Sequence, residues 1–404
     1  MKRIIGLIII FGIIFSISVS AKEGVTVSSE CDISDIEVPI ETAAENAVIG
    51  QKLDIKAKSA VLMEVNTGEI LYSENADEEL PPASITKIMP LLLVMEALDR
   101  GDISLETVVY ASEHACSMGG SQIWLEPGEG MTVDDLLKAT VIASANDACV
   151  ALGEPIAGSE EGFVALMNKR AKELGMNNTN FQNATGLDAE NHYSSAHDVA
   201  VMSRELIKHS LIKNYSTVWM DSLRGGKSEL VNTNKLVRFY NGTTGLKTGT
   251  TSIAKYCLSA TAKRGDMELV AVVLAGETSN DRFLGAKKLL DYGFANYSYK
   301  NLGAELKDGM TAKVQKGVKD KVLVTATDKV NLLLPKTENG DITRKTEWNS
   351  DITAPVKKGD VLGNVRVYMG EKEVGKIPII ANETVEKLNL FVTFKWILNG
   401  LLSF

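Results

Sequence analysis

The chain has 404 residues, 45% of them hydrophobic and 24% charged, so it is long enough for two domains and apolar enough to bury a sizeable core. Its net charge of −9 at pH 7 argues against a nucleic-acid-binding protein, because such proteins usually carry a basic surface. The four cysteines are too few and too widely spaced for a disulfide scaffold, and the four histidines lack metal-ligand spacing. We therefore expect no metal site, and we expect Cys149 and Cys257, which lie in apolar runs, to be buried thiols.

The N-terminus is predicted to direct export. Two basic residues precede a long apolar run, small residues follow at positions 19–21, and charge resumes at Lys22. This order is typical of a secretory signal peptide, here residues 1–21, whereas a retained membrane anchor is the alternative. Residues 22–44 are polar and weakly patterned, which indicates a linker. The mature protein is therefore expected to act outside the cytoplasm.

Residues 45–297 mix strand and helix patterns. Residues 58–77 alternate around Asn-Thr-Gly, which predicts a β-hairpin, and residues 243–276 predict a strand pair that turns at Lys-Arg-Gly-Asp. Apolar periodicity with start and stop signals predicts helices at 84–100, 131–158 (with a polar break at Ser144), 159–175, 195–210 and 279–297. This part is therefore predicted to be an α+β domain.

The pattern changes near residue 298. Short alternating segments separated by Gly, Asp and Lys predict a small all-β domain at 298–384. The tail, residues 385–404, is mostly apolar, but its apolar part is shorter than the roughly 20 residues that a membrane-spanning helix needs. Lys395 falls near the middle of the tail, where a spanning helix would have to bury its charge. Its apolar residues share one helical face, so we predict an amphipathic helix that lies on a membrane surface. A helix packed on the protein's own core is the alternative.

A Ser-x-x-Lys motif occurs three times, and its context separates the copies. Ser84 and Lys87 open an apolar helix after Pro-Pro-Ala, which places both side chains on one face. The second copy, at Ser210, lies at a polar helix end, and the third, at Ser252, lies in a predicted strand where the side chains point to opposite faces. The first copy is therefore the candidate nucleophile site. Pro90 should kink its helix, and the pair survives if the kink falls after Lys87.

Two further motifs follow in the chain. Ser144 and Asn146 form a Ser-x-Asn motif that interrupts an apolar helical region, so its polar groups either find partners in the core or face a cleft. Lys-Thr-Gly occurs once, at 247–249, and opens a predicted strand. Each motif is weak alone, but the three in this order, on helix, loop and strand, are a much stronger signal.

The chain resembles the serine-type D-alanyl-D-alanine carboxypeptidases, which are low-molecular-mass penicillin-binding proteins of the peptidase S11 type. The segments that carry the resemblance are PPASITKIM, LEPGEGMTVDDLLKATVIASANDACVALGE, FQNATGLD and TGLKTGTTSIAKYCLSATAKR. The resemblance covers residues 45–297 and implies a β-lactamase/transpeptidase-like catalytic domain, an antiparallel sheet with helices. The later β domain matches the common two-domain form, and many members end in an anchoring helix.

The chemistry explains why these residue types are needed. A serine hydroxyl is a poor nucleophile until a base takes its proton, so Lys87 would have to be neutral when Ser84 attacks. Burial and a second cation, Lys247, both favour a neutral amine. Ser144 can relay a proton to the leaving amine, and Asn146 can hold the substrate's amide.

The resemblance assigns the remaining roles. Lys247 and Thr248 would bind the terminal carboxylate of D-alanine, and Gly249 would let the substrate backbone approach the strand closely. The backbone N–H groups of Ser84 and Thr250 would form the oxyanion hole.

The resemblance implies acyl transfer without a cofactor. Ser84 would attack the bond between the last two D-alanines of a peptidoglycan stem peptide, and β-lactam antibiotics would be trapped on the same serine. We expect a monomer attached to the outer face of the cytoplasmic membrane. The alternatives are a D,D-endopeptidase, a β-lactamase and a non-catalytic wall-binding protein. A β-lactamase is disfavoured because Glu173 lies in a predicted helix and not in a loop that would hold a deacylating glutamate.

Overall fold

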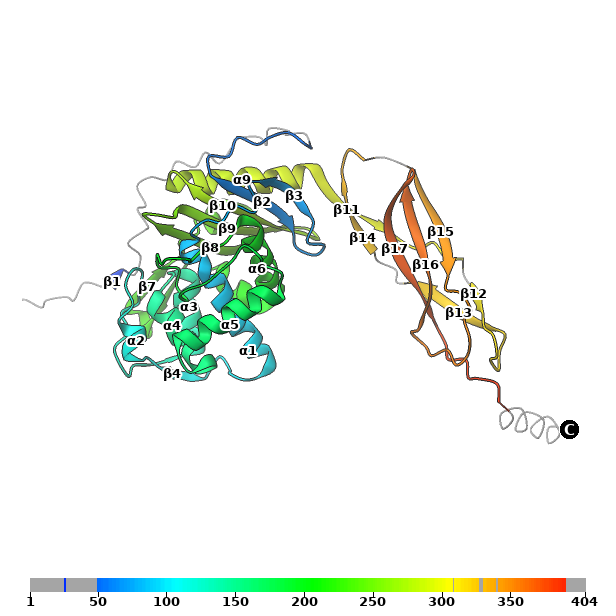
Figure 1. Ribbon diagram of the computed structural model, residues 1–404, viewed down its shortest axis with the longest axis horizontal. Coiled ribbons are helices and arrows are strands. Elements are labelled where there is room, and N and C mark those ends of the chain that lie inside the picture. The colour runs from blue at the N-terminus through cyan, green and yellow to red at the C-terminus, as the bar shows by residue number, and fades with distance from the viewer. Residues whose placement is uncertain (1–24, 27–48, 308, 327–329, 339–340, 390–404) are drawn as a thin grey trace, which may run out of the picture.

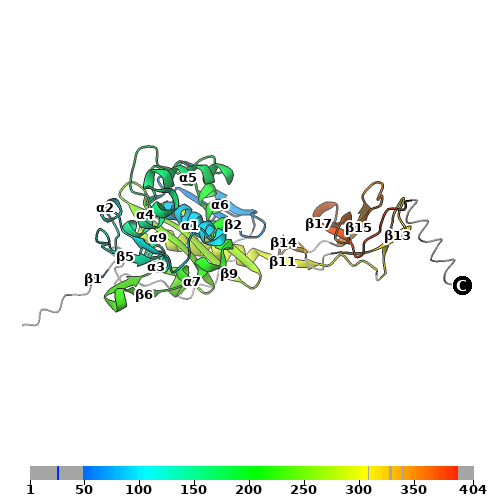
Figure 2. The same cartoon turned by 90° about the horizontal axis from the view of Figure 1, so that it is seen from below.

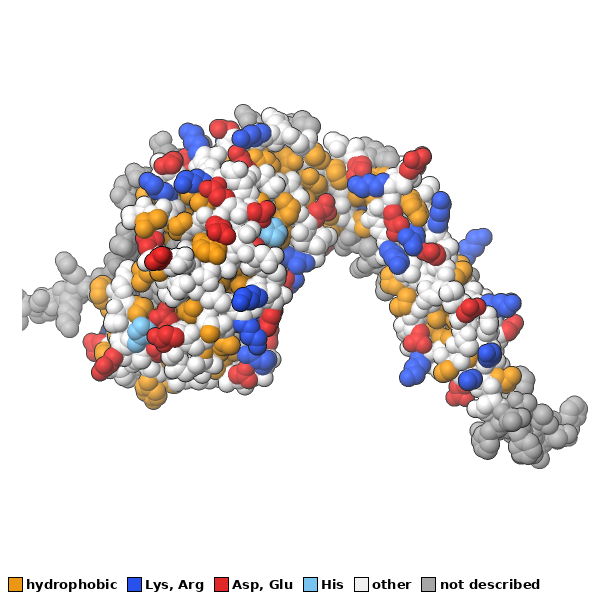
Figure 3. Space-filling model, in the orientation of Figure 1, with side chains coloured by type: hydrophobic (Ala, Val, Ile, Leu, Met, Phe, Trp, Pro, Cys, Tyr) orange, Lys and Arg blue, Asp and Glu red, His pale blue; other side chains and the backbone are white. Residues whose placement is uncertain are grey.

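The computed structural model describes residues 25–26, 49–307, 309–326, 330–338 and 341–389. Figure 1 shows an α+β part and a narrower β part that follow one another along the molecule, joined near β11 and β14, and Figure 2 shows the same elongated arrangement from below. On the face shown in Figure 3, acidic and basic side chains intermingle over both parts. The predicted signal peptide and the end of the predicted anchor, residues 390–404, lie outside the described residues.

A five-stranded antiparallel sheet organises the α+β part. Its strand order is β3-β2-β10-β9-β8, which places β8 at one edge. The strands are β2 (Ser59–Glu64), β3 (Ile70–Glu74), β8 (Thr243–Thr251), β9 (Lys255–Arg264) and β10 (Met267–Gly276). All ten residues of β10 are buried, because helices cover both faces of the sheet. An edge position leaves one side of β8 open, so an extended peptide can pair with it.

The hairpin predicted at 58–77 is confirmed by the antiparallel pair of β2 and β3. The prediction of two strands within 243–276 is wrong, because the segment forms three. A turn at 252–254 separates β8 from β9, so Ser252 lies in a turn and not in a strand. This turn has no Gly, Pro, Asn or Asp, and its Ser252 is a weaker turn former, whereas the predicted turn at Gly265 does separate β9 from β10.

Helices pack on both faces of the sheet (Figure 1). Helix α9 (Ser279–Asn296) lies on one face, where Leu289 and Leu290 are fully buried against the strands. The other helices gather on the opposite face around α1 (Ile88–Arg100), whose apolar residues belong to the largest core. They are α2 (Glu113–Cys116), α3 (Val133–Ile142), α4 (Asn146–Ala157), α5 (Glu160–Glu173), α6 (Ala196–Lys208) and α7 (Lys213–Ser216), with single 3-10 turns at Ser210–Ile212 and Arg224–Gly226. The short helix α8 (Leu236–Phe239) is an exception, because its Leu236 belongs to the same core as α9.

The predicted helix at 84–100 is two helices. Residues Ala83–Lys87 form a 3-10 helix, η2, and α1 begins at Ile88. Pro90 is then the third residue of α1, within its first turn, where a proline is tolerated better than in a helix interior. The change of helix type falls after Lys87, which leaves the Ser84–Lys87 pair together on one 3-10 turn.

Short strands complete the α+β part. β4 (Val108–Tyr110) pairs with β5 (Gly130–Thr132), and β7 (Ser228–Val231) lies between β1 (Val25–Thr26) and β6 (Met220–Leu223). The predicted break at Ser144 is confirmed, because α3 ends at Ile142 and α4 begins at Asn146. The predicted start of α6 is also confirmed, since the Ser195 side chain accepts a hydrogen bond from the Asp198 N–H.

The described part of the chain after α9 contains strands and no helix. A five-stranded sheet has the order β12-β13-β17-β16-β15, and β11 pairs with β14 beside it. The strands are β11 (Tyr297–Leu302), β12 (Thr311–Lys313), β13 (Lys321–Ala326), β14 (Val330–Pro335), β15 (Ile342–Trp348), β16 (Val361–Met369) and β17 (Lys372–Ala381). Val385 is buried and bridges to Val356, and Lys387 bridges to Gly317, so residues 385–389 are not helical. Any C-terminal helix therefore begins later than the predicted residue 385.

The two parts have largely separate cores, which predicts that the first folds alone. A fragment spanning residues 40–297 should still react with penicillin in a 1:1 adduct, seen by intact-protein mass spectrometry. It should melt a few degrees below the full chain, because Leu333 of β14 contributes to the core under α9. Circular dichroism would establish that the fragment is folded, and a folded fragment without any adduct would contradict the prediction.

Candidate active site

The Ser84 hydroxyl and the Lys87 amine meet on η2. Lys87 Nζ is hydrogen-bonded to Ser84 Oγ at 2.9 Å and donates to the Thr185 carbonyl at 2.8 Å. In a 3-10 helix, residues three apart lie above one another, which is why this spacing brings the two groups together. Lys87 is fully buried, whereas Ser84 is half-buried and accessible. A buried amine beside an accessible hydroxyl is the arrangement that a serine nucleophile and its base require.

A tight loop at residues 183–187 holds the carbonyl that binds Lys87. The Asn183 side-chain oxygen accepts hydrogen bonds from the N–H groups of Thr185, at 3.1 Å, and Gly186, at 2.7 Å. Gly186 has a φ of +84°, and a Cβ there would lie 1.8 Å from the Ala83 carbonyl oxygen. Only glycine fits, because the loop presses directly against the residue that precedes Ser84.

Ser144 and Asn146 lie in the turn between α3 and α4. Ser144 has a φ of +63°, a left-handed conformation that is rare outside glycine, and both side chains are buried. Asn146 Nδ2 donates to the Gly119 carbonyl at 2.6 Å, while its Oδ1 atom has no hydrogen-bond partner among the described residues. An unsatisfied buried oxygen is costly, and it is available to accept a hydrogen bond from a bound amide.

The Lys-Thr-Gly motif lies in β8 beside η2. A Cβ on Gly249 would lie 3.0 Å from the backbone nitrogens of both Ser84 and Ile85. The missing side chain therefore lets the strand approach the backbone of Ser84, whereas the sequence predicted a close approach of the substrate backbone. Lys247 and Thr248 are buried, and Thr248 Oγ1 donates to Thr233 Oγ1 at 2.6 Å. The structure thus brings two of the three motifs into direct backbone contact.

The two motif lysines act on the same buried group. Burial raises the pKa of the Cys149 thiol to about 12, and the positive charge that Lys87 and Lys247 carry when protonated opposes that shift. Cys149 lies on α4 behind the site and donates to the Ala184 carbonyl at 3.4 Å. Burial likewise raises the pKa of Cys257 to about 11. Both cysteines are buried thiols, as predicted.

Two further residues that shape the site were not predicted. Arg282 of α9 is buried and donates to the Gly249 carbonyl at 3.1 Å and to Thr250 Oγ1 at 2.8 Å, which fixes the end of β8. Asp147 accepts hydrogen bonds from the N–H groups of Ile123 and Leu125, which holds the loop beside Asn146. The partners of both lie far away in the chain, so no local pattern marks them.

Other titratable residues near the site have structural roles. Burial lowers the pKa of His192 to about 4, so the ring is neutral at pH 7; it accepts from the Gln182 N–H and lies 2.8 Å from Thr86 Oγ1. Glu173 is the last residue of α5 and forms surface ion pairs with Lys169 and Arg170. Within the described residues, no three His, Cys, Asp or Glu side chains cluster as metal ligands would.

These features define a serine acyl-transfer site of the penicillin-binding type: a serine–lysine pair on a helix, a buried Ser-x-Asn turn and a Lys-Thr-Gly edge strand. The sequence profile of the peptidase S11 family, described as D-alanyl-D-alanine carboxypeptidase, matches residues 43–278. The profile described as penicillin-binding protein 5, C-terminal domain, matches residues 297–387. The chain therefore belongs to the peptidase S11 family of D-alanyl-D-alanine carboxypeptidases.

Similar proteins span most of the chain. D-alanyl-D-alanine carboxypeptidase DacF of Bacillus subtilis (strain 168) is 46% identical over 343 residues, which cover 84% of this chain and 88% of that protein. The crystal structure of penicillin-binding protein 5 from Haemophilus influenzae has a TM-score of 0.72 at 31% identity and covers 83% of this chain and 99% of its own. Penicillin-binding protein D2 from Listeria monocytogenes, in its ampicillin-bound form, has a TM-score of 0.55 at 33% identity and covers 60% of this chain and 99% of its own.

The contact of Gly249 with η2 predicts that adding one methyl group at this position slows acylation of Ser84. In Gly249→Ala, the Cβ meets backbone atoms that cannot rotate away, so β8 and Ser84 should move apart by a few tenths of an ångström or more. The rate of acylation by penicillin should fall by about tenfold to a hundredfold, since small displacements of reacting groups have effects of that size. Stopped-flow measurement would test this.

The control for this prediction is Gly303→Ala, where an added Cβ meets nothing within 4 Å. That variant should acylate at the normal rate. An unchanged rate in Gly249→Ala would show that the tight contact with η2 does not set the geometry of the nucleophile.

Proposed function

We propose that Ser84 is the nucleophile of a carboxypeptidase reaction that removes the terminal D-alanine from peptidoglycan stem peptides. The observation that carries the proposal is the 2.9 Å contact of Ser84 Oγ with the fully buried amine of Lys87. Family membership supplies the reaction class, and the contact identifies which serine fits it. Neither of the other Ser-x-x-Lys copies shows such a pair among the described residues: the Lys213 amine forms a salt bridge with Glu268 at 2.8 Å, and Ser252 lies in an exposed turn.

Lys87 is proposed to act as the base. Lys87 and Lys247 are both buried and both act on the Cys149 thiol, and two cations in one water-poor site disfavour each other's charge, which favours a neutral amine at one of them. A neutral amine 2.9 Å from the hydroxyl can take the Ser84 proton as the oxygen attacks the carbonyl carbon. The Thr185 carbonyl, which accepts from the other side of Nζ, keeps the lone pair aimed at Ser84.

The remaining groups are proposed to bind and orient the peptide. The N–H groups of Ser84 and Thr250 would stabilise the oxyanion. The close packing of Gly249 supports this role, because it brings the backbone of β8 next to the backbone of Ser84. Lys247 and Thr248 would hold the terminal carboxylate. Asn146 would accept the substrate's amide N–H on its unsatisfied Oδ1 atom. Ser144 would pass a proton to the departing D-alanine, after which water releases the acyl group from Ser84.

β-Lactam antibiotics are proposed to acylate the same serine. The ampicillin-bound form of the Listeria monocytogenes protein supports this, since that protein is 33% identical to the present chain. The family activity places the protein in cell-wall metabolism. We further propose that residues 298–384 form a domain separate from the catalytic 45–297, and that the protein acts as a monomer.

The protein is proposed to be exported and held on the outer face of the cytoplasmic membrane by its C-terminal tail. Among the described residues there is no helix long and apolar enough to cross a membrane. The tail has the sequence of an amphipathic helix, whose apolar face would carry Leu390, Phe391, Phe394, Leu398, Leu401 and Leu402.

Acylation by penicillin tests the nucleophile. The wild-type protein should gain one adduct, and peptide mapping should locate it on Ser84. Ser84→Ala should form no adduct and should lose at least about a thousandfold in the release of D-alanine from diacetyl-Lys-D-Ala-D-Ala, because the covalent route is gone. Ser210→Ala and Ser252→Ala are matched controls and should react normally. An adduct on the Ser84→Ala protein would refute the assignment.

Removal of the tail tests the anchor. Deleting residues 390–404 leaves Val385 in its core position, so the truncated protein should fold, bind penicillin and appear in the soluble fraction. The intact mature protein should sediment with membranes. If the truncated protein still sediments, the attachment lies elsewhere, and an uncleaved N-terminal segment becomes the explanation to examine.

A further inference from the structure

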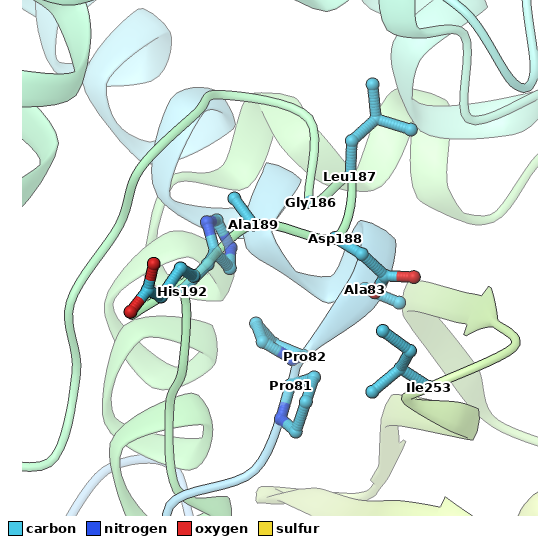
Figure 4. A pocket seen from close by; sticks show the side chains of 10 residues that line it. Pro81, Pro82, Ala83, Gly186, Leu187, Asp188, Ala189, His192 and Ile253 are labelled. Atoms are coloured by element: carbon cyan, nitrogen blue, oxygen red, sulfur yellow. The ribbon is translucent and has the colours of Figure 1, made fainter.

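A cavity of about 290 Å³ lies next to the proposed nucleophile (Figure 4). Its walls come from three segments: Pro81, Pro82 and Ala83 before Ser84, the loop from Gly186 to His192, and Ile253 in the turn after β8. The labelled side chains of Pro82 and Ile253 face one another across it in Figure 4. A cavity of this size is at the small end for ligand pockets, so it fits one side chain and not a whole stem peptide.

The chemistry of this cavity is apolar with two negative charges. Asp188 and Glu190 line it together with the proline rings and Ile253, whose side chain is exposed. Asp188 Oδ1 accepts a hydrogen bond from Thr251 Oγ1 at 2.8 Å, which holds that carboxylate at the end of β8. Within the described residues, neither carboxylate forms a salt bridge. The ring of His192 is neutral at pH 7 because burial lowers its pKa to about 4, so it leaves both charges uncompensated.

A peptide bound as the proposed function requires would run toward this cavity. If Lys247 and Thr248 hold the terminal carboxylate, and the scissile carbonyl lies at Ser84 and Thr250, the rest of the peptide continues past Thr250 along the open edge of β8. The residue before the two D-alanines follows one Cα spacing, about 3.8 Å, later, near Thr251 and Ile253. Its side chain then lies at the mouth of the cavity.

We propose that this cavity is a specificity subsite for a primary ammonium group on a flexible, apolar stem, carried by the residue that precedes the two D-alanines. The methylene groups of such a side chain would pack on Pro81, Pro82 and Ile253, and its ammonium group would lie between the carboxylates of Asp188 and Glu190. Charge complementarity selects this occupant, because a carboxylate in the same place would be repelled by both side chains.

Two peptides that differ only in this charge test the subsite. The probes are Nα-acetyl-Lys-D-Ala-D-Ala, which has a free ε-amine, and Nα,Nε-diacetyl-Lys-D-Ala-D-Ala, which does not. The wild-type protein should prefer the free amine by roughly threefold to tenfold in kcat/KM for release of D-alanine, as two partly exposed ion pairs would supply. The preference should shrink as salt is added, since salt screens exposed charges.

The variant Asp188→Asn/Glu190→Gln removes both charges, while the amide oxygen introduced by Asp188→Asn can still accept the hydrogen bond from Thr251. Its ratio of kcat/KM for the two peptides should fall to about one. The matched control, Glu106→Gln/Glu113→Gln, removes two exposed charges elsewhere and should keep the wild-type ratio. The ratio compares two substrates on one protein, so a general loss of activity does not affect it.

The outcomes are distinguishable. Equal turnover of the two peptides by the wild-type protein, or a preference that persists in the Asp188→Asn/Glu190→Gln variant, would overturn the subsite and leave the carboxypeptidase assignment intact. Cleavage of neither peptide would instead refute the proposed function, and the subsite with it.

Discussion

The close packing of β8 against the 3-10 helix η2 is the constraint on which the rest of the site depends. At Gly249 the strand lies so near the backbone of Ser84 and Ile85 that a single added carbon would collide with it. That approach brings the Lys-Thr-Gly strand and the Ser-x-x-Lys turn, which lie far apart in the chain, into direct contact. Arg282 holds the strand from behind through the Gly249 carbonyl, and Gly186 holds the turn from the other side.

Burial of Lys87 follows from the same packing, and the proposed role of Lys87 as a base depends on it. A lysine in water is a protonated point charge, whereas this side chain is fully buried with its nitrogen bonded to a hydroxyl and a carbonyl. The cost of burying a cation is what makes a neutral amine attainable, and the fold meets that cost with the large apolar core around α1. The positive φ of Ser144 and the unsatisfied oxygen of Asn146 are further local costs at the same place. Strain of this kind collects where function needs a fixed geometry.

Much of this arrangement can be predicted from the sequence, because local chemistry marks it. Helix caps such as Ser195, the hairpin at 58–77 and the polar break at Ser144 follow from patterns a few residues long, and the order of the three motifs indicates the family. Contacts that join distant segments cannot be predicted in this way: Arg282 with Gly249, and Asp147 with Ile123, depend on the tertiary fold. The turn at 252–254 escapes prediction because only Ser252, a weak turn former, marks it. A proline inside a helical pattern predicts a bend, but the start of α1 at Ile88 places Pro90 in the first turn, where it is tolerated.

The turn at 252–254 bears on substrate choice. Because β8 ends at Thr251, the exposed Ile253 leaves the sheet and lines the cavity opposite Pro82. At the core of the site Lys87, Lys247 and Thr248 are buried, so they can fix the reaction but have little freedom to vary. The rim formed by Asp188, Glu190 and Ile253 is exposed and held by few contacts, so its charge can change without disturbing Lys87. Reaction type and peptide preference are therefore set by different residues, and a change at the rim should alter which stem peptide is cleaved while the chemistry at Ser84 stays the same.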